Sequence, residues 1–246
     1  MILPTSPQNT VLITGAAGGI GVGLVEALAE AGWSVLGSDH PSVSPPKRLL
    51  QRCKAWIPAD LGALSRDPHQ LETLRSSVLS AVGNDELMAV VHNAAVQRLG
   101  SFEQLGLADW QETLDVNLMA PVAISRALLP QLKRQRGSIV HIGSIHSQLT
   151  KPGFTAYATS KAALAGLTRA MAVELGGSVR VNAIEPAAIA TPMLEAGFAQ
   201  RPDLRAQLDA FHPIGSIGSP DDVARAVLFL LNPTNCFLNG CVLPLG

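Results

Sequence analysis

The sequence predicts a doubly wound α/β fold, in which helices cover both faces of a mainly parallel sheet of about seven strands. Short apolar runs alternate with segments of helical periodicity along the chain, which is typical of parallel strands joined by crossover helices. A glycine-rich turn directly follows the first apolar run, and this position suits a phosphate-binding turn. The 246 residues suffice for one large domain of this Rossmann type, spanning 1–246, and are few for two.

The first half of the chain supplies four expected strands and two expected helices. Apolar runs predict strands over residues 11–13, 34–38, 55–58 and 87–92. Helical periodicity predicts helices over about 20–31 and 70–82. A segment with three prolines, at positions 41, 45 and 46, separates the second strand from the third, and we expect it at the surface.

The second half predicts one long helix over residues 109–135, interrupted only at Pro121, which removes a helical hydrogen bond. Further strands are expected over 138–142, 179–184 and 241–245, and further helices over 155–175 and 221–231. Between Pro186 and Pro213 the pattern is less regular. The length of this stretch and its apolar residues suggest a lid at about 187–213.

The composition excludes several classes of partner. The chain is 47% hydrophobic and 15% charged with a net charge of −1, and it lacks the basic stripe expected of a nucleic-acid-binding protein. It shows neither a signal peptide nor the apolar run of about 18 residues that a membrane span requires, so we expect a cytoplasmic protein without a membrane partner. The cysteines, Cys53, Cys236 and Cys241, have no metal-binding spacing, so we expect free thiols and no metal.

A tyrosine and a lysine four residues apart open the helix expected over 155–175. On a helix, Tyr157 and Lys161 share one face, so the ammonium group can lie beside the phenol and lower its pKa from about 10. A tyrosine activated in this way can carry a proton to or from a substrate oxygen. Ser144, 13 residues before Tyr157, ends a buried strand and is a further polar candidate for the site.

The glycine-rich turn over residues 14–21 has the form of a site for a dinucleotide. Glycines let the backbone approach a pyrophosphate, and the helix that follows offers free N–H groups; the other interpretation is simply a tight turn. Asp39, at the end of the second strand, can accept hydrogen bonds from the ribose hydroxyls of NAD and would repel the 2′-phosphate of NADP. The alternative is that Asp39 only caps a turn before Pro41.

The ordered set of motifs resembles the short-chain dehydrogenase/reductase family, in its shorter, single-domain branch. The motifs are Gly15-x-x-x-Gly19-Ile20-Gly21, Asp60-Leu61, Asn93-Ala94-Ala95, Asn117, Ser144, Tyr157-x-x-x-Lys161 and Pro186-x-x-Ile189-x-Thr191. The resemblance runs from about residue 10 to the C-terminus. Gly15, Gly18 and Gly21 also fit the turn of a longer branch that modifies nucleotide sugars, but 246 residues leave no room for its additional substrate domain.

The resemblance implies a role for each catalytic position. Tyr157 would be the general acid/base, and Lys161 would lower its pKa and hold the nicotinamide ribose. Ser144 would hydrogen-bond the reacting oxygen. Asn117 would hold a water molecule that links Lys161 to solvent.

The resemblance also implies which residues contact the cofactor and the substrate. Besides the glycine turn and Asp39, the expected cofactor residues are Asp60 and Leu61 at the adenine, Asn93 and Ala94 at the adenosine ribose, and Pro186, Ile189 and Thr191 near the nicotinamide. The substrate candidates are Ser144, His146, Gln97 and Met193. His146 could equally be a solvated loop histidine.

Together these residues predict an NAD-dependent oxidoreductase that interconverts a secondary alcohol and a ketone. Two other classes stay open: a non-catalytic NAD(H)-binding regulatory protein and an enzyme like the nucleotide-sugar epimerases. The resemblance further implies a homo-oligomer, with a tetramer expected before a dimer. The identity of the small-molecule alcohol or ketone is not encoded in any recognisable motif.

Overall fold

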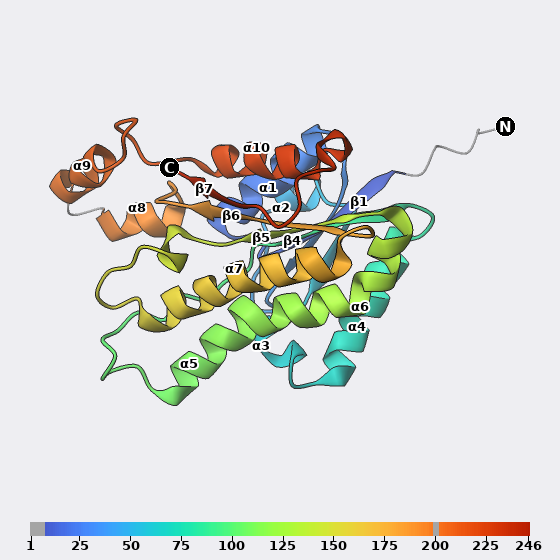
Figure 1. Cartoon of the computed structure of the whole chain (residues 1–246), viewed down its shortest axis with the longest axis horizontal. Coiled ribbons are helices and arrows are strands. Elements are labelled where there is room, and N and C mark those ends of the chain that lie inside the picture. Colours follow the sequence, from blue (N-terminus) through green and yellow to red (C-terminus); the bar gives the residue numbers. More distant parts are fainter. Residues whose placement is uncertain (1–7, 199–201) are drawn as a thin grey trace.

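The computed structural model describes residues 8–198 and 202–246, which form a seven-stranded sheet with the order β3-β2-β1-β4-β5-β6-β7 (Figure 1). Every neighbouring pair of strands is parallel, which confirms the predicted fold class. The strands are β1 (Asn9–Thr14), β2 (Ser34–Asp39), β3 (Ala55–Pro58), β4 (Glu86–His92), β5 (Ser138–Ile142), β6 (Arg180–Pro186) and β7 (Val242–Leu245). Because the strand order reverses between β1 and β4, a crevice for a ligand is expected at the carboxyl ends of these two strands.

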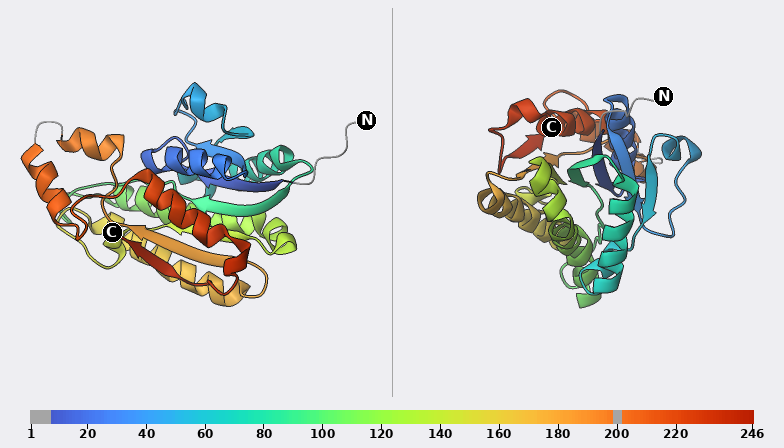
Figure 2. Two further views of the ribbon diagram at one scale, coloured as in Figure 1. Left: turned by 90° about the horizontal axis from the view of Figure 1, so that it is seen from above. Right: turned by 90° about the vertical axis from the view of Figure 1, so that its right-hand side faces the viewer.

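Helices cover both faces of the sheet, as the turned views show (Figure 2). Leucines and valines of α1 and α10 pack on one face, and those of α4 and α6 pack with α7 on the other. The helices are α1 (Gly19–Glu30), α2 (Lys47–Leu50), α3 (Leu61–Leu64), α4 (Pro68–Val82), α5 (Leu107–Leu114), α6 (Ala120–Gln135), α7 (Thr155–Leu175), α8 (Pro192–Phe198), α9 (Pro202–Ala210) and α10 (Pro220–Leu231). The one-turn helices α2 and α3 are too short for periodicity to reveal them.

The strand residues alternate between two apolar cores. Val11 and Ile13 of β1 pack toward α1 and α10, whereas Leu12 between them packs toward α4 and α6. All three side chains are fully buried, as expected for a parallel sheet that is covered on both faces.

The helix predicted over 109–135 is present as one continuous helical stretch over 107–135, but it is not uniform, because a π-helix, η1 (Asp115–Met119), joins α5 to α6. Within it the N–H of Ala120 donates to the carbonyl of Asp115, five residues earlier. Pro121 has no N–H with which to continue the α-helical hydrogen-bond pattern. It is accommodated in the first turn of α6, directly after the wider π-helical turn. Pro130, inside α6, is a second proline that the prediction overlooked.

The lid expected over 187–213 is more regular than predicted. It contains α8 and α9, each of which begins with a proline, a residue suited to the first helical position. Residues 199–201 between them lie outside the described residues. In the part of the chain that the structure describes, no helix combines the length and hydropathy needed to cross a membrane.

Candidate active site

The glycine-rich turn between β1 and α1 needs glycine for two different reasons. Gly15 has a φ of +64°, in the region that favours glycine, and a Cβ there would lie 2.7 Å from the Cα of Ala94. A Cβ on Gly21 would lie 2.0 Å from the carbonyl oxygen of Gly15. The turn is therefore packed against the segment that follows β4 on one side and against the first turn of α1 on the other.

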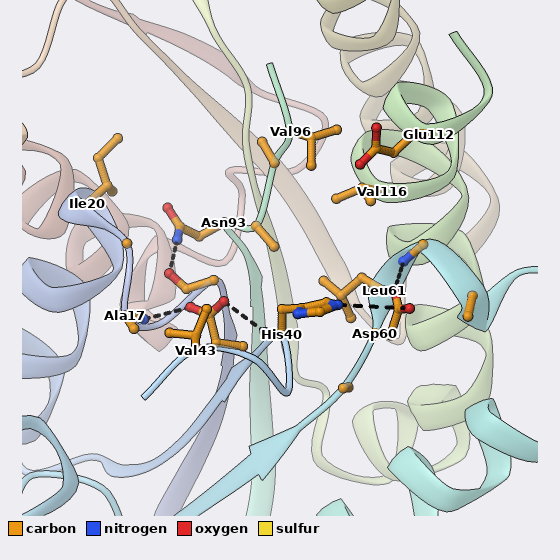
Figure 3. A pocket seen from close by; sticks show the side chains of 18 of the residues that line it. Ala17, Ile20, His40, Val43, Asp60, Leu61, Asn93, Val96, Glu112 and Val116 are labelled. Atoms are coloured by element: carbon orange, nitrogen blue, oxygen red, sulfur yellow. Dashed lines mark hydrogen bonds and ion pairs between the residues drawn. The ribbon is translucent and has the colours of Figure 1, made fainter. Parts of the chain in front are cut away.

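A cavity of about 1000 Å³ opens at the carboxyl ends of the strands, over this turn (Figure 3). Of the predicted cofactor residues, the cavity is lined by Gly15, Gly19, Ile20, Asp39, Asp60, Leu61, Asn93, Ala94 and Thr191. Gly21, Tyr157, Lys161, Pro186 and Ile189 are not in its lining. Gly21 lies beneath the turn, Tyr157 lies in the first turn of α7, and Lys161, Pro186 and Ile189 are buried. Thr191, near the start of the segment expected to be a lid, packs against the glycine turn, since a Cβ on Gly19 would lie 2.6 Å from the Thr191 Cβ.

Asn93 holds the turn in place. Its Nδ2 donates to the carbonyls of Thr14 at 3.1 Å and of Gly15 at 2.8 Å. The hydroxyl of Thr14 accepts from the backbone N–H of Ala94 at 3.2 Å. The side-chain amide expected at the adenosine ribose is thus already engaged by the protein backbone.

Asp39 faces the cavity from the end of β2. Its Oδ2 accepts from the N–H of Ala17 at 2.9 Å, and its Oδ1 accepts from the N–H of His40 at 2.8 Å. The His40 ring points toward Asp60 (Figure 3), with Nε2 4.0 Å from the Asp60 Oδ2. The Asp39 carboxylate therefore holds the glycine turn in place through Ala17 and still has lone pairs that can accept from a ligand.

Arg66 is a cavity residue that the sequence analysis missed. Its guanidinium contacts the buried carboxylate of Asp115 at 2.8 Å and donates to the carbonyl of Gly62. Although a cation lines the cavity, its charge is thus balanced by Asp115.

Ser144 and Tyr157 meet where β5 ends and α7 begins. Ser144 caps the short 3₁₀ helix η2 (Ile145–Ser147), and Tyr157 lies in the first turn of α7. Burial raises the pKa of Tyr157 above its usual value of 10.0, while the hydrogen bond with Ser144 acts in the opposite direction. The lowering of this pKa by Lys161 that the sequence predicts is therefore not found: desolvation raises the pKa, and the opposing effect comes from Ser144.

Lys161 is buried, with 2% of its surface exposed. Its Nζ donates to the carbonyl of Ile142 at 2.8 Å and lies 5.6 Å from the centre of the Tyr157 ring. Burial lowers the pKa of Lys161 to about 8, and the negative charge of Glu185 opposes this shift. The ammonium group is anchored to the backbone of β5 beside the phenol.

Asn117, in the π-helix, ties two elements together. Its Oδ1 accepts from the N–H of Val96 at 2.8 Å, and its Nδ2 donates to the Val96 carbonyl and to the Ser160 hydroxyl, both at 3.0 Å. The side chain thus joins the segment after β4 to α7. Pro121 has no N–H, so the Asn117 carbonyl lacks the donor that a regular α-helix would supply four residues later. The water expected at Asn117 stays a prediction.

The three other substrate candidates, His146, Gln97 and Met193, have different surroundings. His146 stacks on Phe154 with ring centres 4.3 Å apart and meets the Tyr157 ring edge-on at 6.1 Å, and burial lowers its pKa. Gln97 is exposed and does not line the cavity. Met193 lies in α8, and its side chain is outside the described part of the chain.

Two residues beside the site were not anticipated. Glu185, near the end of β6, is buried and accepts a hydrogen bond from the side chain of Gln148 at 3.0 Å. The sequence feature that could have identified Glu185 is its position as a single acid at the end of an apolar strand, directly before Pro186. Phe154, three residues before Tyr157, was likewise detectable as an aromatic residue next to the motif.

Comparisons with known proteins establish the family of the chain. The family model described as "Enoyl-(Acyl carrier protein) reductase" matches residues 15–245. An uncharacterized oxidoreductase of Schizosaccharomyces pombe is 35% identical over 242 residues, which cover 97% of this chain and 90% of that protein. The 3-oxoacyl-(acyl-carrier-protein) reductase FabG of Thermotoga maritima is 31% identical over 242 residues, which cover 94% of both chains.

A solved structure extends the agreement to the fold. The ligand-free aldohexose dehydrogenase of Thermoplasma acidophilum superposes with a TM-score of 0.84 at 27% identity, covering 97% of this chain and 92% of that chain. The match of the family model over nearly the whole chain, the relatives and the motif set around Tyr157 lead to one assignment. The chain belongs to the short-chain dehydrogenase/reductase family of oxidoreductases.

Proposed function

We propose that this oxidoreductase is NAD-dependent and interconverts a secondary alcohol and a ketone, with Tyr157 as the general acid/base. The observation that carries the proposal is the convergence of Ser144, Tyr157 and Lys161 at the strand ends, where the glycine-turn cavity also lies. The names of two similar proteins support this class: one is a reductase of a 3-oxoacyl group, and one is a dehydrogenase of an aldohexose.

The residues of the cavity fit a dinucleotide. Gly15, Gly18 and Gly19 line the cavity without side chains, so their backbone stays open to an approaching pyrophosphate. The first turn of α1 adds N–H groups that have no partner within the helix. Asp39 favours NAD over NADP, because its carboxylate would accept from ribose hydroxyls and repel a phosphate.

The residues of this chain supply the proton chemistry and the orientation. When bound, the nicotinamide supplies the hydride acceptor or donor. In oxidation, Tyr157 takes the proton of the substrate hydroxyl, and in reduction it returns a proton to the carbonyl oxygen. Ser144 hydrogen-bonds the same substrate oxygen, and the Lys161 ammonium stabilises the phenolate through its charge.

The test is turnover of a broad panel of secondary alcohols and ketones, with NAD(H) and NADP(H) in parallel, followed by the absorbance of the reduced nicotinamide. We expect turnover with NAD(H). Turnover only with NADP(H) would contradict the role of Asp39 and leave that of Tyr157 intact. Tight NADH binding without turnover of any compound would instead favour a non-catalytic binding protein.

A further inference from the structure

Glu185 is a buried acid beside the site that the reaction described above does not use. It is 1% exposed, at the carboxyl end of β6. Its Oε2 accepts from Gln148, while its Oε1 has no hydrogen-bond partner. An ionised carboxylate is costly to bury unless an opposite charge lies nearby. The charged groups around Glu185 therefore indicate what compensates for burying its carboxylate.

The strand geometry places Glu185 on the same face of the sheet as α7. Val181 packs in the core formed with α4, α6 and α7, whereas Ile184 packs in the opposite core. Because side chains alternate along a strand, Glu185 points to the same face as Val181. Lys161, which extends from α7, is on this face too.

Gly143 brings the carboxylate and the ammonium close together. Its missing side chain makes room for Glu185, since a Cβ there would lie 2.9 Å from the Glu185 Cγ. The preceding residue, Ile142, has the carbonyl to which the Lys161 Nζ donates. The two buried charges thus lie over Ile142, the last residue of β5, and Gly143, which follows it, although they are not in direct ion-pair contact.

Among the residues that the structure describes, no other acid around Lys161 is available to balance its charge. The charged or titratable groups on the elements that surround Lys161 are Asp109 and Glu112 on α5, Asp115 on η1, His141 on β5, His146 on η2, Arg180 and Glu185 on β6, and Tyr157, Arg169 and Glu174 on α7. Glu112 is paired with Arg98, Asp115 is paired with Arg66, and Asp109 accepts from the N–H of Gly106 at the start of α5. Arg169 and Glu174 are exposed on the later turns of α7.

We infer that Glu185 is the buried counter-charge of Lys161 and keeps this lysine protonated in the active site. It acts as a positioning residue: it touches neither substrate nor cofactor in this role and works through the charge of Lys161. Gln148, which follows η2, holds the carboxylate by one oxygen and leaves the other free to face positive charge. The inference rests on the proposed function in treating Lys161 as the partner of Tyr157.

The inference has a direct consequence for the pH range of activity. The negative charge of Glu185 opposes the fall in the Lys161 pKa that burial causes. Without it, Lys161 would lose its proton at a lower pH, and the phenolate of Tyr157 would lose its stabilising charge there. The alkaline limb of the pH–rate profile would then move to lower pH.

The test measures the charge of Lys161 without relying on turnover. Only a neutral amine is acylated, so trace labelling with acetic anhydride across a pH series, read by peptide mass spectrometry, gives the labelling midpoint of each lysine. Exposed Lys133 in the same sample is the internal standard. Glu185→Gln, which keeps size and shape, should lower the Lys161 midpoint by about one to two pH units. If this variant fails to fold, Glu185→Met, also uncharged, replaces it.

Two further variants separate charge from packing. Glu185→Asp keeps the carboxylate and should keep the midpoint closer to that of the natural protein. Asp115→Asn removes another deeply buried carboxylate, next to Arg66, and should leave the Lys161 midpoint unchanged. An unchanged midpoint in Glu185→Gln, or an equal fall in Asp115→Asn, would overturn the inference.

The pH–rate profile then connects the counter-charge to catalysis. With a substrate from the panel, the alkaline limb of the pH–rate profile of Glu185→Gln should move to lower pH, together with the labelling midpoint of Lys161. A shifted midpoint with an unmoved limb would overturn the catalytic part of the inference. A natural protein that turns over no panel compound would count against the proposed function alone, because the labelling result does not depend on activity.

Discussion

At the scale of single residues, the surroundings of Tyr157 define what this side chain can do. Its ring meets Phe154 and His146 edge-on, and its phenol interacts with Ser144. This burial raises the pKa of Tyr157, so the protein alone holds it as a neutral phenol at neutral pH. As a neutral phenol it carries the proton that the reducing direction requires, and it depends on nearby positive charge to lose that proton in the oxidising direction.

Tyr157→Phe tests the proton-transfer role, because it keeps the ring and removes the hydroxyl. We expect turnover to fall by about 10²- to 10⁴-fold, the usual contribution of general acid–base catalysis. NADH binding, followed by the fluorescence of the nicotinamide, should change little. Turnover near that of the natural protein would refute the assignment.

Asp39→Asn tests the cofactor preference with little change in shape. The amide oxygen can still accept from the N–H of Ala17, so the turn keeps its brace, but the charge that repels a phosphate is gone. We expect the ratio of kcat/KM for NAD to that for NADP to fall by about 10-fold or more, since a hydrogen bond to a charged group contributes about 1.5–3 kcal/mol. Asp60→Asn, in the neighbouring cavity wall, is the control and should affect both cofactors similarly.

At the scale of secondary-structure elements, two histidines join the central strands to the helices that cover them. His92 on β4 lies opposite His141 on β5, with ring centres 5.3 Å apart. Nε2 of His92 hydrogen-bonds the Ser125 hydroxyl of α6, and Nδ1 of His141 hydrogen-bonds the Thr168 hydroxyl of α7. Burial lowers the pKa of both rings, that of His141 to about 3.

These low pKa values predict a loss of stability in acid. Below pH 6.5 the unfolded chain binds protons that the folded chain excludes, so the free energy of unfolding falls as the pH falls toward about 3. Each histidine contributes a slope of up to about 1.4 kcal/mol per pH unit. His141→Gln should reduce the slope measured by urea unfolding at a series of pH values. Exposed His69→Gln is the control, and an equal slope in His141→Gln would contradict the explanation.

Two glycines in helices should respond to alanine in opposite directions. At Gly21 in α1 the new methyl group would lie 2.0 Å from the Gly15 carbonyl oxygen, and we expect a loss of about 1–3 kcal/mol in the free energy of unfolding. Gly166 in α7 has no neighbouring atom within 4 Å of a built Cβ. Gly166→Ala should therefore add about 0.5–1 kcal/mol. Urea unfolding measures both, and a gain at Gly21 would contradict the packing of the turn.

At the scale of the whole molecule, one long side of the domain carries exposed apolar residues on neighbouring helices. Leu107 on α5 is 89% exposed and Val173 on α7 is 85% exposed, and the two helices lie side by side (Figure 1). We propose that α5 and α7 form a contact between copies of this chain in a homotetramer.

Light scattering after size exclusion tests this assembly. We expect a mass of about four times the 25.7 kDa of one chain. Val173→Glu should produce a smaller species, because it would place a charge in the contact. Phe211→Glu, at an exposed apolar residue after α9, is the control and should keep the mass. A monomeric natural protein would refute the proposal.

The sequence by itself determined the parallel sheet, the glycine turn and the positions of Ser144, Tyr157 and Lys161. These features are encoded locally: strand and helix periods repeat every few residues, and a glycine turn follows directly from its own steric needs. Tyr157 and Lys161 are one helical turn apart, so their proximity also needs no tertiary contact.

Only the tertiary structure decided what surrounds these residues. Asn117 bonds to Ser160, 43 positions away, and Glu185 bonds to Gln148, 37 positions away. The rise in the Tyr157 pKa and the burial of Lys161 likewise result from helices and strands that meet from distant parts of the chain. Desolvation and hydrogen-bond partners depend on this packing, and no local pattern in the sequence records them.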